Sequence, residues 1–290
     1  MQPATTFAIL AYDGIEPIDI GATYGVLSMA RRLAPNLRFF VVSKSGGEIA
    51  MANGLRLIAD CDFDDCPRAD VMMVLGGPGW QAASDDPGIT AFIAEFHRCQ
   101  GTVAGVCTGG MILAAAGLLA GRAATTTREI VEGETSPLDL LAQNYPQTRA
   151  IRARLVDTGS ILTGGGVSLG IDMTLHLIAR YLGRKAAEET ARILEYRRAW
   201  NANGAELADV VELAGAAIFL SDSKQSPDAG GCRARNHSAL RGHCGRCGSA
   251  TLGTTHAAPA CQSLYIHPQF AKSTRGEGAC WLSGSGSSSV

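Results

Sequence analysis

Apolar runs of strand length alternate with segments of helical period through the first 200 residues of the chain. Strands are predicted at four of the apolar runs, 6–12, 37–44, 71–77 and 102–107. Helices are predicted between or after these runs, following Asp19 and over 88–99 and 108–119. This alternation predicts an α/β fold in which helices cover both faces of a doubly wound, mostly parallel sheet. Val71–Leu75 has no polar residue, as expected of a strand buried on both faces.

The later part of this region predicts a different local arrangement. Arg154–Asp157 and Ser160–Thr163 flank a Thr158-Gly159 turn, and they predict a hairpin-like edge of the sheet. Ser168–Leu182 carries apolar residues at helical spacing and is followed by Gly183, a residue type that commonly ends helices. The segment 205–220 predicts one closing helix.

Residues 221–290 differ in composition from everything before them. They hold 12 Ser, 10 Gly and 3 Pro, with no sustained apolar period. Such a segment offers too little apolar surface for a packed core, and its composition is typical of linkers and disordered chains. We therefore predict an α/β domain over 1–220 that folds alone, followed by a low-complexity C-terminal tail over 221–290.

The charge balance argues against a nucleic-acid or membrane partner. The net charge is −2 and the pI is near 6.3, and the tail carries only seven Lys and Arg against three Asp and Glu. No apolar run reaches the roughly 18 residues of a membrane-spanning helix, and the first residues lack the basic start of a signal peptide. These features predict a cytoplasmic protein with a small-molecule partner.

The nine cysteines fall into two groups, four in the first 107 residues and five in the last 60. In a reducing cytosol the first group, Cys61, Cys66, Cys99 and Cys107, is expected to remain as free thiols. In the second group Cys244 and Cys247 have the spacing of zinc ligands. No second matching pair follows, so chance clustering is favoured and no metal or other cofactor is predicted.

Cys107 stands in the most informative local pattern, between the apolar run 102–106 and the helical segment that follows Gly109-Gly110. A cysteine at such a strand-to-helix turn lies at the carboxyl edge of the sheet, beside the N–H groups of a helix N-terminus. The partial positive charge of a helix N-terminus favours the thiolate and predicts a lowered thiol pKa. The flanking glycines permit the sharp turn of a nucleophile elbow. A buried structural cysteine is the alternative.

Two further segments supply candidate partners for this thiol. The strand at 71–75 ends in a glycine-rich turn in which Gly77 and Gly79 have backbone N–H groups that could stabilise an oxyanion, whereas Pro78 has none. An ordinary strand-to-helix turn is the alternative. Asp19, between the first strand and the first helix, could transfer protons or serve only as a helix-terminal acid.

Six ordered motifs within residues 5–203 resemble the ThiJ/PfpI superfamily: IEPIDIGATYGVL, LGGPG, GVCTGG, AAAGLLAGRAATT, ILTGGGVSLGIDM and LEYRRAWN. Within it, Asp19, the Cys107-Thr108 pair and the run 163–166 are most similar to the isocyanide (isonitrile) hydratase branch. The resemblance implies a flavodoxin-like sandwich that forms a homodimer. It places the nucleophile at Cys107, its neighbouring threonine at Thr108, the carboxylate at Asp19 and the backbone pocket at Gly77.

The reaction implied by the resemblance adds water to an isocyanide and gives an N-substituted formamide. The thiolate of Cys107 would attack the terminal carbon, Asp19 would manage the proton on nitrogen, and water would resolve a thioimidate. The chain departs from the family pattern at two places. Thr127-Arg128 replaces the superfamily's histidine, which argues against a Cys-His pair, and Pro78 replaces the branch's threonine in the glycine turn.

Two other functions remain open from the sequence. The domain could be the N-terminal sensor-like part of an AraC-type transcription regulator, because some of these regulators carry a similar domain before their helix-turn-helix part. Residues 203–290 offer no paired amphipathic helices, so the DNA-binding part would be lacking. Alternatively, Cys107 could be the centre of a redox sensor or of a carbonyl-stress protein of the glyoxalase or deglycase kind, since a thiol near a carboxylate also supports oxidation.

Overall fold

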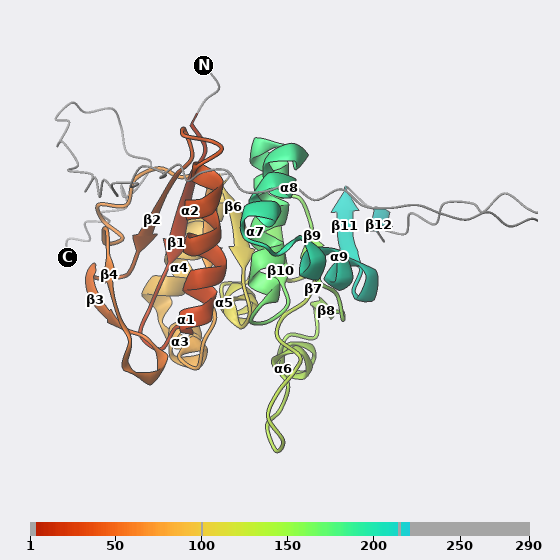
Figure 1. Ribbon diagram of the computed structural model, residues 1–290. Coiled ribbons are helices and arrows are strands. Elements are labelled where there is room, and N and C mark those ends of the chain that lie inside the picture. Colours follow the sequence, from red (N-terminus) through yellow and green to blue (C-terminus); the bar gives the residue numbers. More distant parts are fainter. Residues whose placement is uncertain (1–3, 100, 214–215, 221–290) are drawn as a thin grey trace, which may run out of the picture. The chain divides into compact units, whose positions relative to one another are not determined.

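The computed structural model describes residues 4–99, 101–213 and 216–220, and its centre is a mixed sheet (Figure 1). Five parallel strands follow one another across the sheet: β2 (Arg38–Val42), β1 (Thr6–Leu10), β5 (Val71–Val74), β6 (Thr102–Gly105) and β10 (Ile161–Gly164). In chain order this is the 2-1-3-4-5 arrangement of flavodoxin-like folds. The predicted fold class is therefore confirmed.

The sheet continues past β10 with three more strands. They are β9 (Leu155–Asp157), antiparallel to β10, β11 (Asp209–Leu213), parallel to β9, and β12 (Ala216–Leu220), antiparallel to β11. Two small pairs stand apart from this sheet, formed by β3 (Gly47–Ala50) with β4 (Arg56–Ala59) and by β7 (Ala123–Ala124) with β8 (Arg149–Ala150). The hairpin predicted around Gly159 is thus confirmed.

Helices cover both faces of the sheet. On one face α2 (Val26–Arg31), α7 (Leu169–Leu182) and α8 (Arg184–Ile193) pack together. On the other face are α3 (Trp80–Asp85), α4 (Pro87–Arg98) and α5 (Gly109–Ala115). The remaining helical segments are α1 (Pro17–Ile20), the π-helical turn η1 (Gly21–Gly25), the 3-10 turn η2 (Ala52–Gly54), α6 (Pro137–Asn144) and α9 (Arg197–Glu206).

Helix α4 shows how the local sequence produces these elements. The side chain of Asp86 caps its first turn by accepting from the N–H groups of Gly88 and Ile89, and Pro87 occupies the first helical position. Its buried residues recur at helical spacing and form the stripe that meets the sheet: Ile89, Phe92, Ile93 and Phe96. Strand β5, by contrast, is buried along its whole length because helices cover both its faces.

The structure corrects two predicted elements. The helix expected over 108–119 is shorter, because α5 ends at Ala115. The closing helix expected over 205–220 is wrong, since 209–213 and 216–220 are strands. Val210 and Val211 are β-branched residues, which fit a pleated strand, and β9 offers an edge on which the backbone of β11 pairs.

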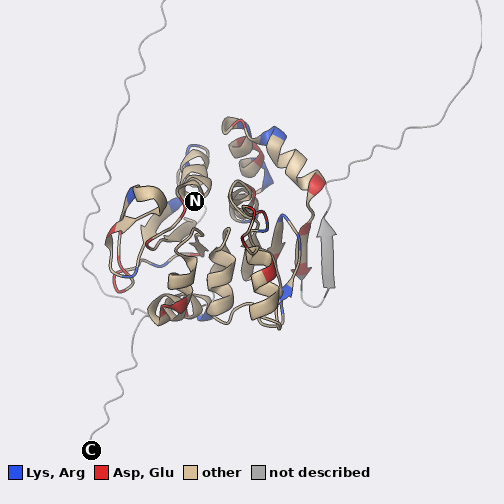
Figure 2. Cartoon of the chain, turned by 90° about the horizontal axis from the view of Figure 1, so that it is seen from below, with Lys and Arg blue, Asp and Glu red and all other residues tan. Residues whose placement is uncertain are grey.

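The surface of the described residues carries both signs of charge. Figure 2 shows Lys and Arg interspersed with Asp and Glu over the helices and loops. Among the described residues, none of the helices is both long and apolar enough to cross a bilayer. The predicted tail, 221–290, including the Cys244-Cys247 pair, lies outside the described residues.

Candidate active site

Cys107 lies in a tight turn between β6 and α5, and its backbone has a φ of 55°, a left-handed conformation that is costly for a residue with a side chain. Close glycines make room for this turn. A Cβ on Gly109 would lie 2.1 Å from the carbonyl oxygen of Val74, and one on Gly76 would lie 2.8 Å from the Cβ of Cys107. The local sequence therefore builds the sharp strand-to-helix turn that was predicted, and the role of Cys107 as a nucleophile stays a prediction.

The sulfur of Cys107 is surrounded by hydrogen-bonding groups. Its Sγ lies 2.9 Å from Oγ1 of Thr127, and the backbone N–H groups of Thr108 and Val167 also donate to it. The residue is only 6% exposed. Val167 precedes α7 and has a φ of 56°, which is also left-handed.

Asp19 lies in the first turn of α1 and is fully buried. Its Oδ2 accepts a hydrogen bond of 2.9 Å from the backbone N–H of Gly76. Its other oxygen, Oδ1, has no partner of regular hydrogen-bond geometry among the described residues. The carboxyl and the Cys107 thiol are close enough to shift each other's pKa. The structure therefore brings together the two side chains that the sequence predicted to act as a pair.

Burial dominates the ionisation of this pair. It raises the pKa of Asp19 to about 7, assisted by the charge of Glu16 and opposed by the Gly76 N–H and by Cys107. Burial and then the charge of Asp19 raise the pKa of Cys107 to about 11, although Thr127 and the N–H groups of Val167 and Thr108 lower it. The expected lowered thiol pKa is therefore wrong for the resting site, because the donors at the helix start do not offset burial.

The glycine turn does not offer the oxyanion donors that were predicted. The N–H of Gly77 donates to Oγ1 of Thr108 at 2.9 Å, and the N–H of Gly79 donates to the carbonyl oxygen of Gly14 at 3.1 Å. Thr108 therefore ties the elbow to the glycine turn through its side chain. The backbone donors that meet the sulfur are instead those of Thr108 and Val167.

The sequence reasoning missed three residues of this site. Thr127 was noted only as a departure from the family pattern, and Val167 and Tyr12 were not considered. Tyr12 is buried, donates its hydroxyl to the carbonyl oxygen of Leu75 at 2.9 Å, and has a pKa raised by burial, by Asp19 and by Cys107. Thr127 had one usable signal, since it occupies the position of the family's histidine.

The two histidines among the described residues, His97 and His176, interact away from Cys107. His176 pairs with Asp157 at 2.9 Å, and Nδ1 of His97 lies 3.4 Å from the carbonyl oxygen of Gly101. Among the described residues, no group of three or more His, Cys, Asp or Glu side chains is arranged to hold a metal ion. The groups that surround the Cys107 thiol are a carboxyl group, a hydroxyl and backbone N–H groups.

The fold and the site together define a class of cysteine-centred α/β proteins. The sheet has the flavodoxin-like order, and a strained cysteine turn lies beside a buried carboxyl group from the first helix. The comparison with family models agrees with this class. Residues 5–180 match the model of the DJ-1/PfpI family, and the chain belongs to that family.

Individual relatives include both an enzyme and regulators. The isonitrile hydratase of Pseudomonas putida is 32% identical over 195 residues, 67% of this chain and 79% of that protein. The HTH-type transcriptional regulator CdhR of Pseudomonas aeruginosa is 27% identical over 64% of this chain, which spans only 53% of the regulator. Among solved structures, a THiJ/PfpI family protein from Pseudomonas syringae superposes with a TM-score of 0.57 and 28% identity, over 67% of this chain and 75% of that one.

Proposed function

We propose that the chain is a cysteine-dependent hydratase that adds water to an isocyanide and releases an N-substituted formamide. The observation that carries the proposal is the buried Asp19, whose pKa of about 7 lets it exchange protons near neutrality beside the Cys107 thiol. The similarity to an isonitrile hydratase supports the same reaction. An isocyanide suits such a site because its terminal carbon accepts a nucleophile and then needs a proton.

The first half of the proposed reaction forms a covalent thioimidate. Ionised Asp19 takes the thiol proton as Sγ of Cys107 bonds to the terminal carbon of the isocyanide. The electron pair left on that carbon then takes the proton from Asp19, which gives an R–N=CH–S linkage. The proton thus goes first to carbon, which corrects the assignment to nitrogen made from the family resemblance.

The second half returns the thiol. Water adds to the thioimidate carbon, the C=N electrons move to nitrogen, and nitrogen takes a proton. The C–S bond then breaks as the new hydroxyl loses its proton and becomes the carbonyl, the leaving sulfur takes up a proton as the thiol, and an R–NH–CHO product remains. The N–H groups of Thr108 and Val167, which already donate to Sγ, would stabilise the sulfur as it becomes anionic. Asp19 supplies and recovers the protons in both halves.

The purified full chain tests this proposal directly. Incubation with cyclohexyl isocyanide is expected to yield N-cyclohexylformamide, detected by mass spectrometry, at a rate that rises with protein concentration. Methylglyoxal serves as the parallel substrate for the carbonyl-stress alternative. Turnover of methylglyoxal without turnover of any aryl or alkyl isocyanide would overturn the hydratase proposal and favour that alternative.

Replacing Thr127 by valine is expected to slow the reaction about 10-fold. The substitution keeps the shape of the side chain but removes the hydroxyl that lies 2.9 Å from Sγ. In the wild type this hydroxyl lowers the pKa of Cys107. The thiol pKa, measured from the pH dependence of alkylation, is expected to rise further. Thr127→Ser keeps the hydroxyl and is the matched control. Equal rates in the valine and serine variants would exclude a role for the hydroxyl.

A sensor-like domain is the second candidate, because three of the similar proteins are HTH-type regulators and the chain spans about half of each. A regulator requires a DNA-binding part, whereas the elements described up to 220, including α9, β11 and β12, belong to the α/β domain. Tight, salt-dependent binding of the full chain to double-stranded DNA would favour this role.

A homodimer and a cytoplasmic location also stay predictions. Analytical ultracentrifugation would measure the oligomeric state.

A further inference from the structure

A second pair of reactive groups lies outside the candidate active site, in the loop that follows β4. Cys61 and Cys66 are both partly exposed, and their thiols are hydrogen-bonded to each other. Four residues lie between them in the sequence, so the loop folds back on itself to bring the sulfurs together. Neither thiol takes part in the proposed chemistry of Cys107.

The loop between the two cysteines is anchored in a way that keeps them together. The backbone of Cys61 forms an isolated parallel bridge to strand β2. Within the loop, the N–H of Asp65 donates to Oδ1 of Asp62 at 2.8 Å. The ring of Phe63 stacks on that of Phe92 in α4, with centroids 3.8 Å apart. These contacts fix the conformation of the loop and so hold the two thiols near each other.

The hydrogen bond divides the roles of the two sulfurs. The hydrogen bond between the two thiols raises the pKa of Cys61 and lowers that of Cys66. Each sulfur also has a carbonyl oxygen nearby, that of Val41 at 4.0 Å from Sγ of Cys61 and that of Pro67 at 3.5 Å from Sγ of Cys66. The thiolate is the nucleophile in thiol chemistry, so Cys66 is the residue that attacks first. Cys61 then lies beside it as the thiol that completes a second exchange.

We propose that Cys61 and Cys66 form a reversible intrachain disulfide by exchange with a low-molecular-weight disulfide such as oxidised glutathione. The Cys66 thiolate bonds to one sulfur of the reagent, whose S–S bond breaks and releases one thiol. Cys61 loses its proton and bonds to the Cys66 sulfur, which releases the second thiol. The two protein thiols are oxidised, and one reagent disulfide is reduced to two thiols.

Peptide mapping tests this site without any assay of activity. Trypsin cuts after Arg56 and Arg68, so both cysteines fall within the single peptide 57–68. After incubation with oxidised glutathione and blocking of free thiols with iodoacetamide, this peptide is expected to lose two hydrogens and carry no carbamidomethyl group. Dithiothreitol added before blocking is expected to restore two carbamidomethyl groups.

Single serine variants separate an intrachain disulfide from independent reactions. Cys61→Ser is expected to trap a stable glutathione adduct at Cys66, whereas Cys66→Ser is expected to react much more slowly at Cys61. Brief labelling with iodoacetamide at neutral pH is expected to modify Cys66 before Cys61. A wild-type peptide with two glutathione adducts, or with both thiols still free after full exposure, would overturn the proposal.

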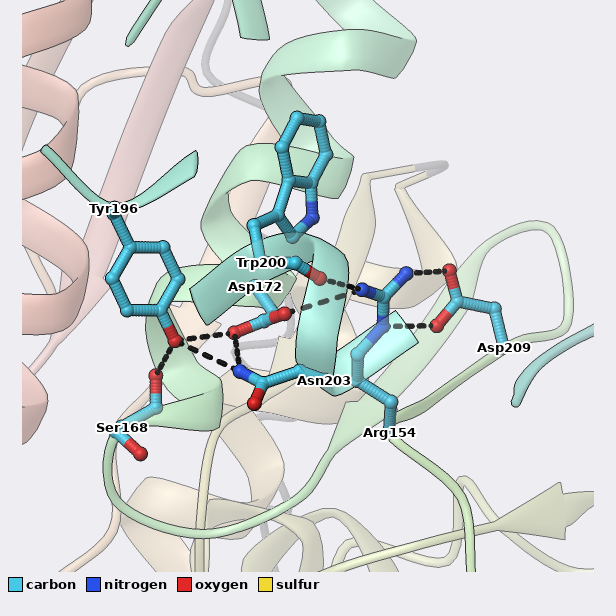
Figure 3. A network of polar contacts seen from close by, with 7 residues as sticks. All are labelled: Arg154, Ser168, Asp172, Tyr196, Trp200, Asn203 and Asp209. Atoms are coloured by element: carbon cyan, nitrogen blue, oxygen red, sulfur yellow. Dashed lines mark hydrogen bonds and ion pairs between the residues drawn. The ribbon is translucent and has the colours of Figure 1, made fainter. Parts of the chain in front are cut away.

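A different observation carries a second inference, which concerns a network of polar contacts around Arg154 and Asp172 (Figure 3). The guanidinium group of Arg154 binds Asp209 through Nε and Nη2, at 2.7 and 2.6 Å. Its Nη1 donates to Asp172 at 3.3 Å and to the carbonyl oxygen of Trp200 at 3.1 Å. The network thus joins Arg154, immediately before β9, to α7, α9 and β11.

Tyr196 connects this network to the loop that contacts the Cys107 sulfur. Its hydroxyl donates to Oδ2 of the fully buried Asp172 at 2.7 Å and lies 3.3 Å from the carbonyl oxygen of Ser168. At the other end of the loop, the N–H of Gly165 donates to the carbonyl oxygen of Arg154 at 3.0 Å. The segment 165–168 is therefore held at both ends.

The held segment includes the group that meets the thiol. Val167 donates its N–H to Sγ of Cys107 from a left-handed backbone conformation, which a β-branched residue adopts only when its surroundings enforce it. Gly166 packs against Thr127 so closely that an added Cβ would lie 2.4 Å from its Oγ1. A shift of this segment would move two of the groups that contact the sulfur.

We infer that Tyr196 is a positioning residue that fixes the 165–168 segment, and through it the donors to the Cys107 thiol. The inference rests on the proposed function only in taking Cys107 as the reactive group. Tyr196→Phe removes the hydroxyl and keeps the ring. The alkylation rate of Cys107 at neutral pH is expected to fall several-fold, and the midpoint of its pH dependence is expected to move to higher pH.

Tyr181→Phe is the matched control, because that hydroxyl binds Oγ1 of Thr102 at 2.6 Å, at the start of β6. It is expected to leave the pH dependence of Cys107 alkylation unchanged even if it lowers the melting temperature. An unchanged midpoint in Tyr196→Phe, or equal shifts in both variants, would overturn the inference. Because alkylation requires no isocyanide, this result is independent of whether the hydratase proposal holds.

Discussion

Cys107→Ala is expected to abolish formamide production, with a loss in kcat on the order of 10⁴-fold or more. The covalent route requires a sulfur at this position. Without the sulfur, the backbone N–H groups that donate to it have no thiolate to stabilise. The measurement is the initial rate of N-cyclohexylformamide formation by wild type and variant at equal concentration.

Cys99→Ala is the matched control for this variant. Cys99 is a partly exposed thiol at the C-cap of α4, which precedes β6 in the sequence. It is expected to retain the wild-type rate. Mass spectrometry of the wild-type protein during turnover is expected to show a covalent adduct on Cys107. Formamide production that survives in Cys107→Ala would contradict the assignment of the nucleophile.

Asp19→Asn is expected to lower kcat by about 10²-fold or more while making the thiol easier to ionise. The amide cannot accept the proton of Cys107, so the chemical step loses its base. The negative charge of Asp19 also raises the pKa of Cys107, and its removal is expected to bring that pKa below about 11. Faster alkylation together with slower hydration would separate proton transfer from a purely electrostatic role.

The pH profile gives an independent check on Asp19. The base form of the carboxyl exists above its pKa, so the wild-type rate is expected to rise with pH through about 7. Glu16 raises the pKa of Asp19, so Glu16→Gln is expected to move this rise to lower pH. Asp19→Asn is expected to lack it. A wild-type rate that is flat between pH 6 and 8 would contradict the role of Asp19 as the base.

Thermal unfolding tells whether the loss in Asp19→Asn comes from misfolding. The folded state holds the proton of Asp19 up to about pH 7, whereas the unfolded chain releases it near the ordinary value of 3.8. The folded state therefore binds more protons between these values, and this residue costs stability as the pH rises through them. At pH 8 the asparagine variant is expected to melt no lower than the wild type.

The local sequence determined the fold class and the elbow because both depend on neighbours along the chain. Uninterrupted apolar residues in the strand at 71–75 require cover on both faces, and that requirement indicates a parallel sheet between helix layers. Cys107 followed by Gly109 and Gly110 predicted the sharp turn because few residues other than glycine fit so close to a neighbouring strand. The pairing of Asp19 with Cys107 followed from the rule that loops at the carboxyl ends of parallel strands meet.

The tertiary structure alone decided which groups meet the sulfur and what they do to it. Thr127 contacts Cys107 from 20 residues away, and Gly77 uses its N–H on Thr108, neither of which a strand-and-helix pattern predicts. The segment 209–213 became a strand rather than a helix because β9 offered an edge to pair with. The pKa values of Asp19 and Cys107 depend on desolvation by the whole surrounding fold, which motif spacing does not reveal.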